Sequence, residues 1–306
     1  MECAGLTPLF LMRQIEQKPI KERAARLSAL ALVAVAMLFA FRSRARVTSV
    51  SAESEHAYLG FDRNDYPGDA ALPILHKTFA FSSYWLSPPP GEKTNTWKGK
   101  RELLASHGFG FLVLYRGRDS SELRTETDAA RKGTQDENAA VTTAKEEGFA
   151  PGTIIFLDIE EGGRLSSTYH KYVGVWSEEL KRAGFRAGVY CSGIPVKEEA
   201  AVTITTAEDI RNQATPHQIV IWAFNDVCPP SPGCAFPRNP PTPSASGIPF
   251  AEVWQFAQSP RRKERTALCP SKYAPDGNCY APGDTARKWF LDVNLATSPD
   301  PSGGGK

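Results

Sequence analysis

The feature that most constrains this chain is an alternation of short apolar runs with longer polar stretches from residue 57 onward. Short apolar runs bounded by turn-forming residues are typical of buried strands, and the polar stretches between them have helical character. The eight runs are Ala57–Asp62, Thr78–Ser83, Gly110–Arg116, Gly152–Glu160, Arg186–Gly193, His217–Phe224, Ala251–Ala257 and Trp289–Asn294. Eight strands alternating with helices over about 240 residues predict an α/β fold, a (β/α)8 barrel of the TIM type built on parallel strands.

Four of the intervening stretches are predicted to be helices: 96–107, 128–148, 167–184 and 205–213. Two connections break the alternation and make the expected barrel irregular. The connection 228–249, after the sixth strand, holds eight of the chain's 24 prolines, too many for a regular element. The connection 261–284 follows the seventh strand. Loops that follow barrel strands lie on the face where active sites form.

The first 52 residues are predicted to form a cytoplasmic leader with a signal peptide or signal-anchor. The run Leu27–Phe41 is uncharged, mostly apolar and flanked by basic residues. It is shorter than the roughly 20 residues that cross a bilayer, and Ala52 is a candidate cleavage position. A buried amphipathic helix of a cytosolic protein is the alternative. We therefore expect an exported barrel domain over 53–297, whether secreted, periplasmic or membrane-anchored, followed by a flexible tail over 298–306.

Charge and cysteine content agree with that expectation. The net charge is only +2, so no nucleic-acid partner is expected, and a membrane would be contacted only through the N-terminal segment if it is uncleaved. Cys228 and Cys234, and likewise Cys269 and Cys279, lie close together in loop-like sequence where a disulfide would restrain the chain, although four cysteines allow three pairings. A zinc site is the alternative, and Cys191 is predicted to be a buried free thiol.

Carboxylates gather at the predicted strand ends. Asp62 closes the first strand, Asp158 and Glu160 close the fourth, and Asp292 lies near the end of the eighth. Residues i and i+2 of a strand share a face, so Asp158 and Glu160 should lie together, with Cα atoms about 6 to 7 Å apart. Two carboxyl groups buried side by side favour one protonated member, as a general acid requires. The alternative is that these acids cap strands or pair with nearby arginines.

Aromatic and amide side chains also lie near the strand ends, where rings can stack on sugars and hydroxyl or amide groups can orient them. The candidate substrate-binding residues are Tyr115, Tyr190, Ser192, Trp254 and Gln255. Trp222 is a weaker candidate, and burial in the core is the alternative for each ring. The sequence lacks nucleotide-binding, serine-hydrolase and zinc-protease motifs, so no cofactor and no metal are expected.

Six of the motifs, taken in order, resemble the family-25 glycoside hydrolases, the lysozyme-type muramidases. They are GFDRNDYPG, IIFLDIE, GVYCSG, IVIWAF, VWQF and LDVN. The resemblance spans roughly residues 57–297 and is closest to the glycoside-hydrolase-like domain called domain of unknown function 1906. Muramidases of the family usually carry a Lys and an acidic residue after strand two, where this chain reads FAFSSYWLSPPP.

The resemblance implies a role for each acid and a peptidoglycan-type polysaccharide as partner. Glu160 corresponds to the proton donor, and Asp158 to the acid that assists the substrate's acetamido group or stabilises positive charge. Asp62 and Asp292 match the remaining acids of the site. The expected function is an exported glycoside hydrolase. A non-catalytic carbohydrate-binding barrel and a barrel enzyme of another chemistry are the alternatives.

Overall fold

The structure is a computed structural model that describes residues 57–305, apart from 200–201, 214–218, 228–230 and 267–271. Each of the eight apolar runs forms one strand of a single sheet. In spatial order they are β1 (Tyr58–Asp62), β2 (Phe81–Trp85), β3 (Gly110–Arg116), β4 (Ile154–Asp158), β5 (Arg186–Ser192), β8 (Ile219–Phe224), β9 (Ala251–Ala257) and β11 (Phe290–Ala296). The short strand β10 (Cys279–Tyr280) adds to β11. Pairing of β1 with β11 closes the barrel, which confirms the predicted TIM-type fold.

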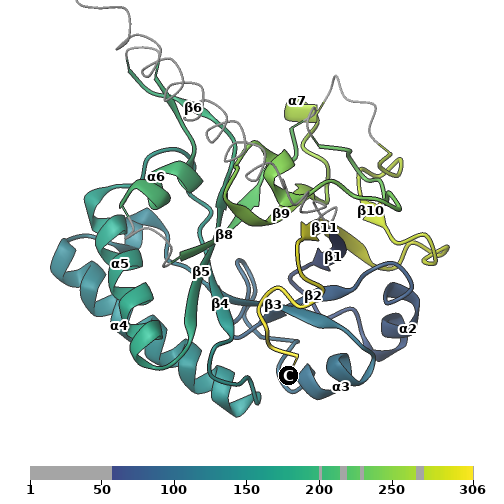
Figure 1. Cartoon of the computed structure of the whole chain (residues 1–306), viewed down its shortest axis with the longest axis horizontal. Coiled ribbons are helices and arrows are strands. Elements are labelled where there is room, and N and C mark those ends of the chain that lie inside the picture. Colours follow the sequence, from purple (N-terminus) through teal and green to yellow (C-terminus); the bar gives the residue numbers. More distant parts are fainter. Residues whose placement is uncertain (1–56, 200–201, 214–218, 228–230, 267–271, 306) are drawn as a thin grey trace, which may run out of the picture. The chain divides into compact units, whose positions relative to one another are not determined.

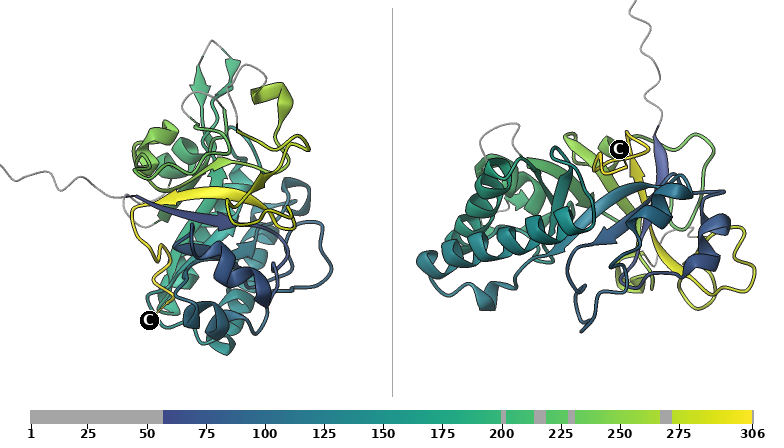
Figure 2. Two further views of the ribbon diagram at one scale, coloured as in Figure 1. Left: turned by 90° about the vertical axis from the view of Figure 1, so that its right-hand side faces the viewer. Right: turned by 90° about the horizontal axis from the view of Figure 1, so that it is seen from below.

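The last strand runs against the others. β11 pairs antiparallel with both β1 and β9, whereas the other barrel pairings are parallel, and Figure 2 shows β1 and β11 side by side. The prediction of eight parallel strands is therefore wrong for β11. A parallel connection needs a crossover of a dozen or more residues, usually a helix. Of the described residues between β9 and β11, only α7 (Lys263–Thr266) is helical, so the chain turns back at the same end of the barrel.

The four predicted helices are confirmed as α3 (Arg101–Ser106), α4 (Glu126–Glu146), α5 (Ser167–Arg182) and α6 (Thr206–Gln213). Shorter elements are η1 (Asp69–Ala71), α2 (Leu72–Leu75), η2 (Ser120–Glu122), β6 (Val196–Lys197), β7 (Thr203–Ile204) and η4 (Pro243–Ser246). Figure 1 shows α4 and α5 packed together on the side of β4 and β5. In the proline-rich connection before β9, the described residues form only η4. The helical layer is therefore uneven.

Large rings fill the barrel interior where the neighbouring strand carries glycine. A Cβ on Gly60 would lie 2.0 Å from the Phe81 ring, and one on Gly188 would lie 2.5 Å from the Phe156 ring. Phe156 in turn meets the ring of Trp222 edge-on, with 5.7 Å between centroids. Since such rings leave no room for a second side chain, the two glycines are needed for packing. The rings of Phe81, Phe156 and Trp222 thus fill the barrel interior below the carboxylates, which lie at the carboxyl ends of the strands.

The described residues after β11 are hydrogen-bonded to the barrel, and for them the expectation of a flexible tail is wrong. The Asp300 carboxylate accepts a hydrogen bond from the backbone N–H of Phe111 at 2.9 Å. Ser302 accepts one from Val113 through Oγ at 2.9 Å and one from Ile154 through its carbonyl at 2.8 Å. The segment thus satisfies backbone donors of β3 and β4 that would otherwise lack partners.

A disulfide joins the loop after β8 to the short strand β10. It links Cys234 to Cys279, whose Cα atoms are 5.4 Å apart, so of the three pairings that the sequence left open these two residues do not pair with their neighbours in sequence. Cys228 and Cys269 lie outside the described residues. Cys191 is buried and free, as predicted.

The predicted leader and signal segment also lie outside the described residues. Among the helices that the structure describes, none is long and apolar enough to cross a membrane.

Candidate active site

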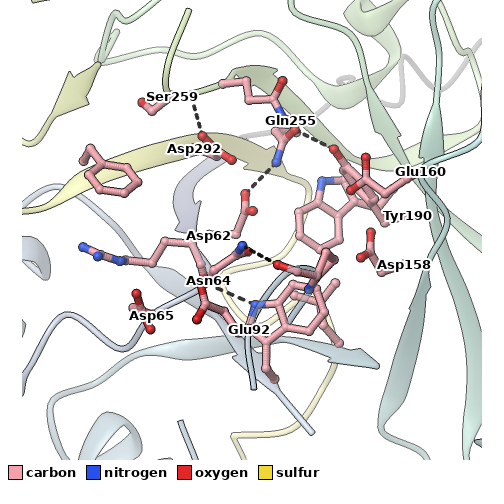
Figure 3. Close-up of a pocket in the computed structure, with 17 residues that line it drawn as sticks. Asp62, Asn64, Asp65, Glu92, Asp158, Glu160, Tyr190, Gln255, Ser259 and Asp292 are labelled. Atoms are coloured by element: carbon pink, nitrogen blue, oxygen red, sulfur yellow. Dashed lines mark hydrogen bonds between the residues drawn. The ribbon is translucent and has the colours of Figure 1, made fainter. Parts of the chain in front are cut away.

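A pocket of about 280 Å³ opens at the carboxyl ends of the parallel strands. All four predicted catalytic acids line it: Asp62, Asp158, Glu160 and Asp292. In Figure 3, Asp158 and Glu160 lie on one side, Asp292 lies on the other, and Asp62 lies between them. Because β11 is antiparallel, Asp292 enters the pocket from the beginning of its strand, and its register partner is Asp62 at the end of β1.

Asp158 and Glu160 form a pair in which one carboxyl group is buried and the other is at the rim. Asp158 is 5% exposed. Burial raises its pKa well above the usual value, and the charges of Glu160 and Asp62 and a hydrogen bond to Glu160 add to this rise. Burial of the carboxyl group also raises the pKa of Glu160, whereas the Arg262 guanidinium and the hydrogen bond from Asp158 oppose the rise. Since the Glu160 side chain is partly in solvent and Asp158 is buried, the protonated form is favoured more strongly at Asp158 than at Glu160.

The backbone holds Asp158 from both sides. The N–H of Gly117, after β3, donates to the Asp158 carbonyl at 3.0 Å, and the N–H of Ile159 donates to the Tyr190 carbonyl at 2.9 Å. A Cβ on Gly117 would lie only 2.1 Å from the Asp158 carbonyl oxygen. Glycine at this position therefore permits the close approach that fixes the end of β4.

Asp62 is the centre of a hydrogen-bond network. Its Oδ1 accepts from Gln255 Nε2 at 2.9 Å and from Asn294 Nδ2 at 2.6 Å. The Tyr190 hydroxyl donates to Gln255 Oε1 at 2.8 Å, and Trp222 Nε1 donates to Asn294 Oδ1 at 2.9 Å. An indole N–H can only donate, so it fixes the Asn294 amide with its NH₂ group toward Asp62.

The two amide donors stabilise the ionised form of Asp62, but burial outweighs them. Burial raises the pKa of Asp62 from 3.8 to about 6; the bonds from Asn294 and Gln255 lower it, and the charge of Glu160 raises it. Burial, together with the charge of Asp62, raises the pKa of Asp292 well above the usual value, and a hydrogen bond from the N–H of Ser259 opposes that rise. Burial and the repulsion between their charges therefore favour the protonated forms of these acids.

Of the predicted substrate-binding residues, the structure brings Tyr190 and Gln255 to the pocket. Tyr115 packs against Trp176 of α5, outside the barrel. The Ser192 hydroxyl accepts the N–H of Ile194, and its side chain does not line the pocket.

Trp222 rather than Trp254 faces the carboxylates. Trp254 is fully buried, and its Nε1 donates to the Asn225 carbonyl at 2.8 Å. Neighbouring strand residues face opposite sides, so Trp254 could not share the pocket with Gln255. The ranking of Trp254 above Trp222 is wrong for this reason.

Several residues in or beside the pocket were not singled out from the sequence. Asn294 follows Asp292 by two positions on the same face of β11, so strand periodicity could have found it. Arg63, Glu92 and Phe290 line the pocket. Glu92 belongs to the loop after β2, and no periodic pattern in the sequence places it here.

Arg262 is a further residue near the acids that the sequence did not reveal. Its Nε lies 3.6 Å from the fully buried Asp226 carboxylate, and its guanidinium lies over the Phe224 ring at 4.3 Å. Its charge reaches Glu160 and opposes the rise in that group's pKa. The loop after β9 thus brings a cation to the rim of the site.

Comparison with known proteins agrees with this architecture. Residues 89–229 match the family model described as the Rv2525c-like, glycoside hydrolase-like domain. An uncharacterised protein of B. stearothermophilus is 21% identical, with a TM-score of 0.50 over 78% of this chain and 95% of its own, which supports the fold. Comparison with curated proteins gives no significant match.

Two other solved structures have lower structural similarity. The Mycobacterium tuberculosis Tat-secreted protein Rv2525c, in complex with HEPES, is 14% identical, with a TM-score of 0.46 over 80% of this chain and 97% of its own. The modular autolysin LytC of Streptococcus pneumoniae, in complex with a synthetic peptidoglycan ligand, is 14% identical, with a TM-score of 0.43 over 78% of this chain and 46% of its own. The expected resemblance is confirmed by the family model: the segment that carries Asp158 and Glu160 resembles the glycoside hydrolase-like domain of the Rv2525c type.

Proposed function

We propose that this protein is an exported glycoside hydrolase that acts on a peptidoglycan-type or related amino-sugar polysaccharide. The observation that carries the proposal is the placement of Asp158 and Glu160 beside two further acids in one pocket at the carboxyl ends of the strands, where burial raises the pKa of both carboxyl groups. Glycoside cleavage needs one carboxylic acid to protonate the leaving oxygen and one carboxylate to act on the sugar or on water. The match to a glycoside hydrolase-like domain supports the same chemistry.

In this mechanism, the proton held by the pair is delivered through Glu160, the member at the rim. Asp158 holds the proton before the reaction and passes it to Glu160 as Glu160 protonates the leaving oxygen. The Asp158 carboxylate that remains stabilises positive charge on the sugar. Asp62, held by two amide donors, presents its second oxygen to the substrate. Activity should fall on the alkaline side as the pair loses its shared proton.

Two substitutions test the assignment. Glu160→Gln keeps the shape of the side chain but removes the carboxyl group that passes the proton to the leaving oxygen, so turnover should fall about 10²- to 10⁴-fold while glycan binding persists. Asp158→Asn should also impair turnover. Glu161→Gln is the matched control, because that carboxylate accepts the N–H of Ser120 at 2.8 Å and does not line the pocket.

The assay is release of reducing ends from peptidoglycan, chitin and other exported polysaccharides, with binding measured on the same panel. If the wild type binds glycan but releases no reducing ends, and both variants bind equally well, the alternative of a non-catalytic carbohydrate-binding barrel replaces the enzyme.

Export is part of the proposal and has its own test. The Cys234–Cys279 disulfide supports it, since stable disulfides are rare in the cytosol. A reporter that is active only in the cytoplasm, fused to the C-terminus, should give no signal. A strong signal would contradict export.

A further inference from the structure

One wall of the pocket combines an exposed ring with an arginine. Phe290, the first residue of β11, is 45% exposed, although it lines the pocket. Of the residues that the structure describes, only two other large apolar side chains are exposed, Val196 and Val202. Phe290 precedes Asp292 by two positions and so shares its face of the strand. The ring therefore stands at the rim, next to the Asp292 carboxyl group.

The Arg63 guanidinium packs against this ring. The Cζ atom of Arg63 lies 5.0 Å from the centroid of the Phe290 ring. The backbone carbonyl of Arg63 accepts a hydrogen bond from Trp85 Nε1 at 3.1 Å. Its Nε and Nη1 are buried and have no hydrogen-bond partner among the described residues. Buried donors without partners are rare in native proteins, which indicates that water or a ligand oxygen completes this wall.

The charges around Arg63 define the kind of oxygen that suits it. The negative charges of Asp65 and Asp292 act on its guanidinium. Six carboxyl groups and this one arginine line the pocket. The positive charge is thus already compensated, and an added carboxylate would meet repulsion from the acids around it. A neutral carbonyl or hydroxyl oxygen could accept from Arg63 without that repulsion.

We propose that Arg63 and Phe290 form a sugar subsite beside Asp62 and Asp292 that takes an uncharged hexose or N-acylhexosamine and rejects a sugar bearing a carboxylate. The apolar face of the sugar stacks on Phe290, and its carbonyl or hydroxyl oxygen accepts from Arg63. The inference rests on the proposed function because it names the substrate class of the same pocket.

The test measures binding without turnover, in the Glu160→Gln background of the full chain. The probes are N,N′,N″-triacetylchitotriose, which is neutral, and trigalacturonate, a trisaccharide that carries carboxylates. The neutral probe should bind at least about 10-fold more tightly. Phe290→Ala should weaken its binding about 5- to 10-fold, whereas Phe290→Tyr keeps the ring and the affinity.

Arg63→Lys, which keeps the charge but loses the planar donor group, should also weaken binding of the neutral probe. Val202→Ala is the matched control, because that side chain is 52% exposed but lies outside the pocket. Thermal unfolding of each variant separates a lost subsite from a lost fold.

Three results would overturn the inference: tighter or equal binding of trigalacturonate, no binding of the neutral probe, or unchanged affinity in a folded Phe290→Ala variant. If the wild type releases no reducing ends but the neutral probe binds through Phe290, the proposed hydrolase fails while the subsite stands.

Discussion

Replacing Asp62 by Asn should stabilise the protein at neutral and alkaline pH while it damages the site. Burial raises the pKa of Asp62 from 3.8 to about 6. A folded-state pKa above the unfolded value favours the protonated form in the native protein. The contribution of Asp62 to the free energy of unfolding is therefore most favourable below its unfolded pKa. It is lost as pH rises through the folded pKa, between about pH 4 and about pH 6.

The size of the effect follows from the same values. The pKa rises by about 2 units, and each unit corresponds to about 1.4 kcal/mol. Ionising Asp62 in the native protein therefore costs about 3 kcal/mol above pH 6. Because the charge of Glu160 contributes to the rise, neighbouring carboxyl groups can share the proton, and this figure is an upper limit. An Asn side chain keeps an oxygen to accept from Gln255 and Asn294 but has no charge to bury.

Urea unfolding of wild type and Asp62→Asn at about pH 4 and about pH 8 tests this reasoning. The variant should match the wild type within about 0.5 kcal/mol at the lower pH and exceed it by about 1 to 3 kcal/mol at the higher pH. Asp65→Asn, which removes the same charge from an exposed carboxyl group at the pocket, is the control. A stability difference that is the same at both pH values would refute the argument that burying the ionised Asp62 carboxylate destabilises the native state.

Three further changes test the packing of the barrel. Ser302→Ala should lower the free energy of unfolding by about 1 to 3 kcal/mol, because the N–H of Val113 loses its acceptor; wild-type stability in urea would contradict the role of the C-terminal segment. Gly188→Ala should destabilise the barrel by about 1 to 3 kcal/mol through contact with the Phe156 ring; an unchanged thermal midpoint would show that the ring can move aside. Peptide mapping without reductant should recover Cys234 joined to Cys279, and a pairing of either with a sequence neighbour would contradict the structure.

The sequence by itself determined the eight strands, the four main helices and the sharing of one face by Asp158 and Glu160. These features follow from local rules. A strand buried on both faces needs an unbroken apolar run, and the alternation of side chains along a strand places positions i and i+2 together. The same alternation shows that Trp254 and Gln255 cannot both face the interior.

Only the tertiary structure decided which way the last strand runs and what surrounds the acids. The direction of β11 depends on where the chain returns after the loop that follows β9, and that loop carries no periodic pattern. The pairing of Cys234 with Cys279 and the docking of Ser302 on β3 and β4 join residues far apart in sequence. The perturbed pKa values arise from burial and from charges on different strands, because electrostatic effects act through space once the barrel has closed.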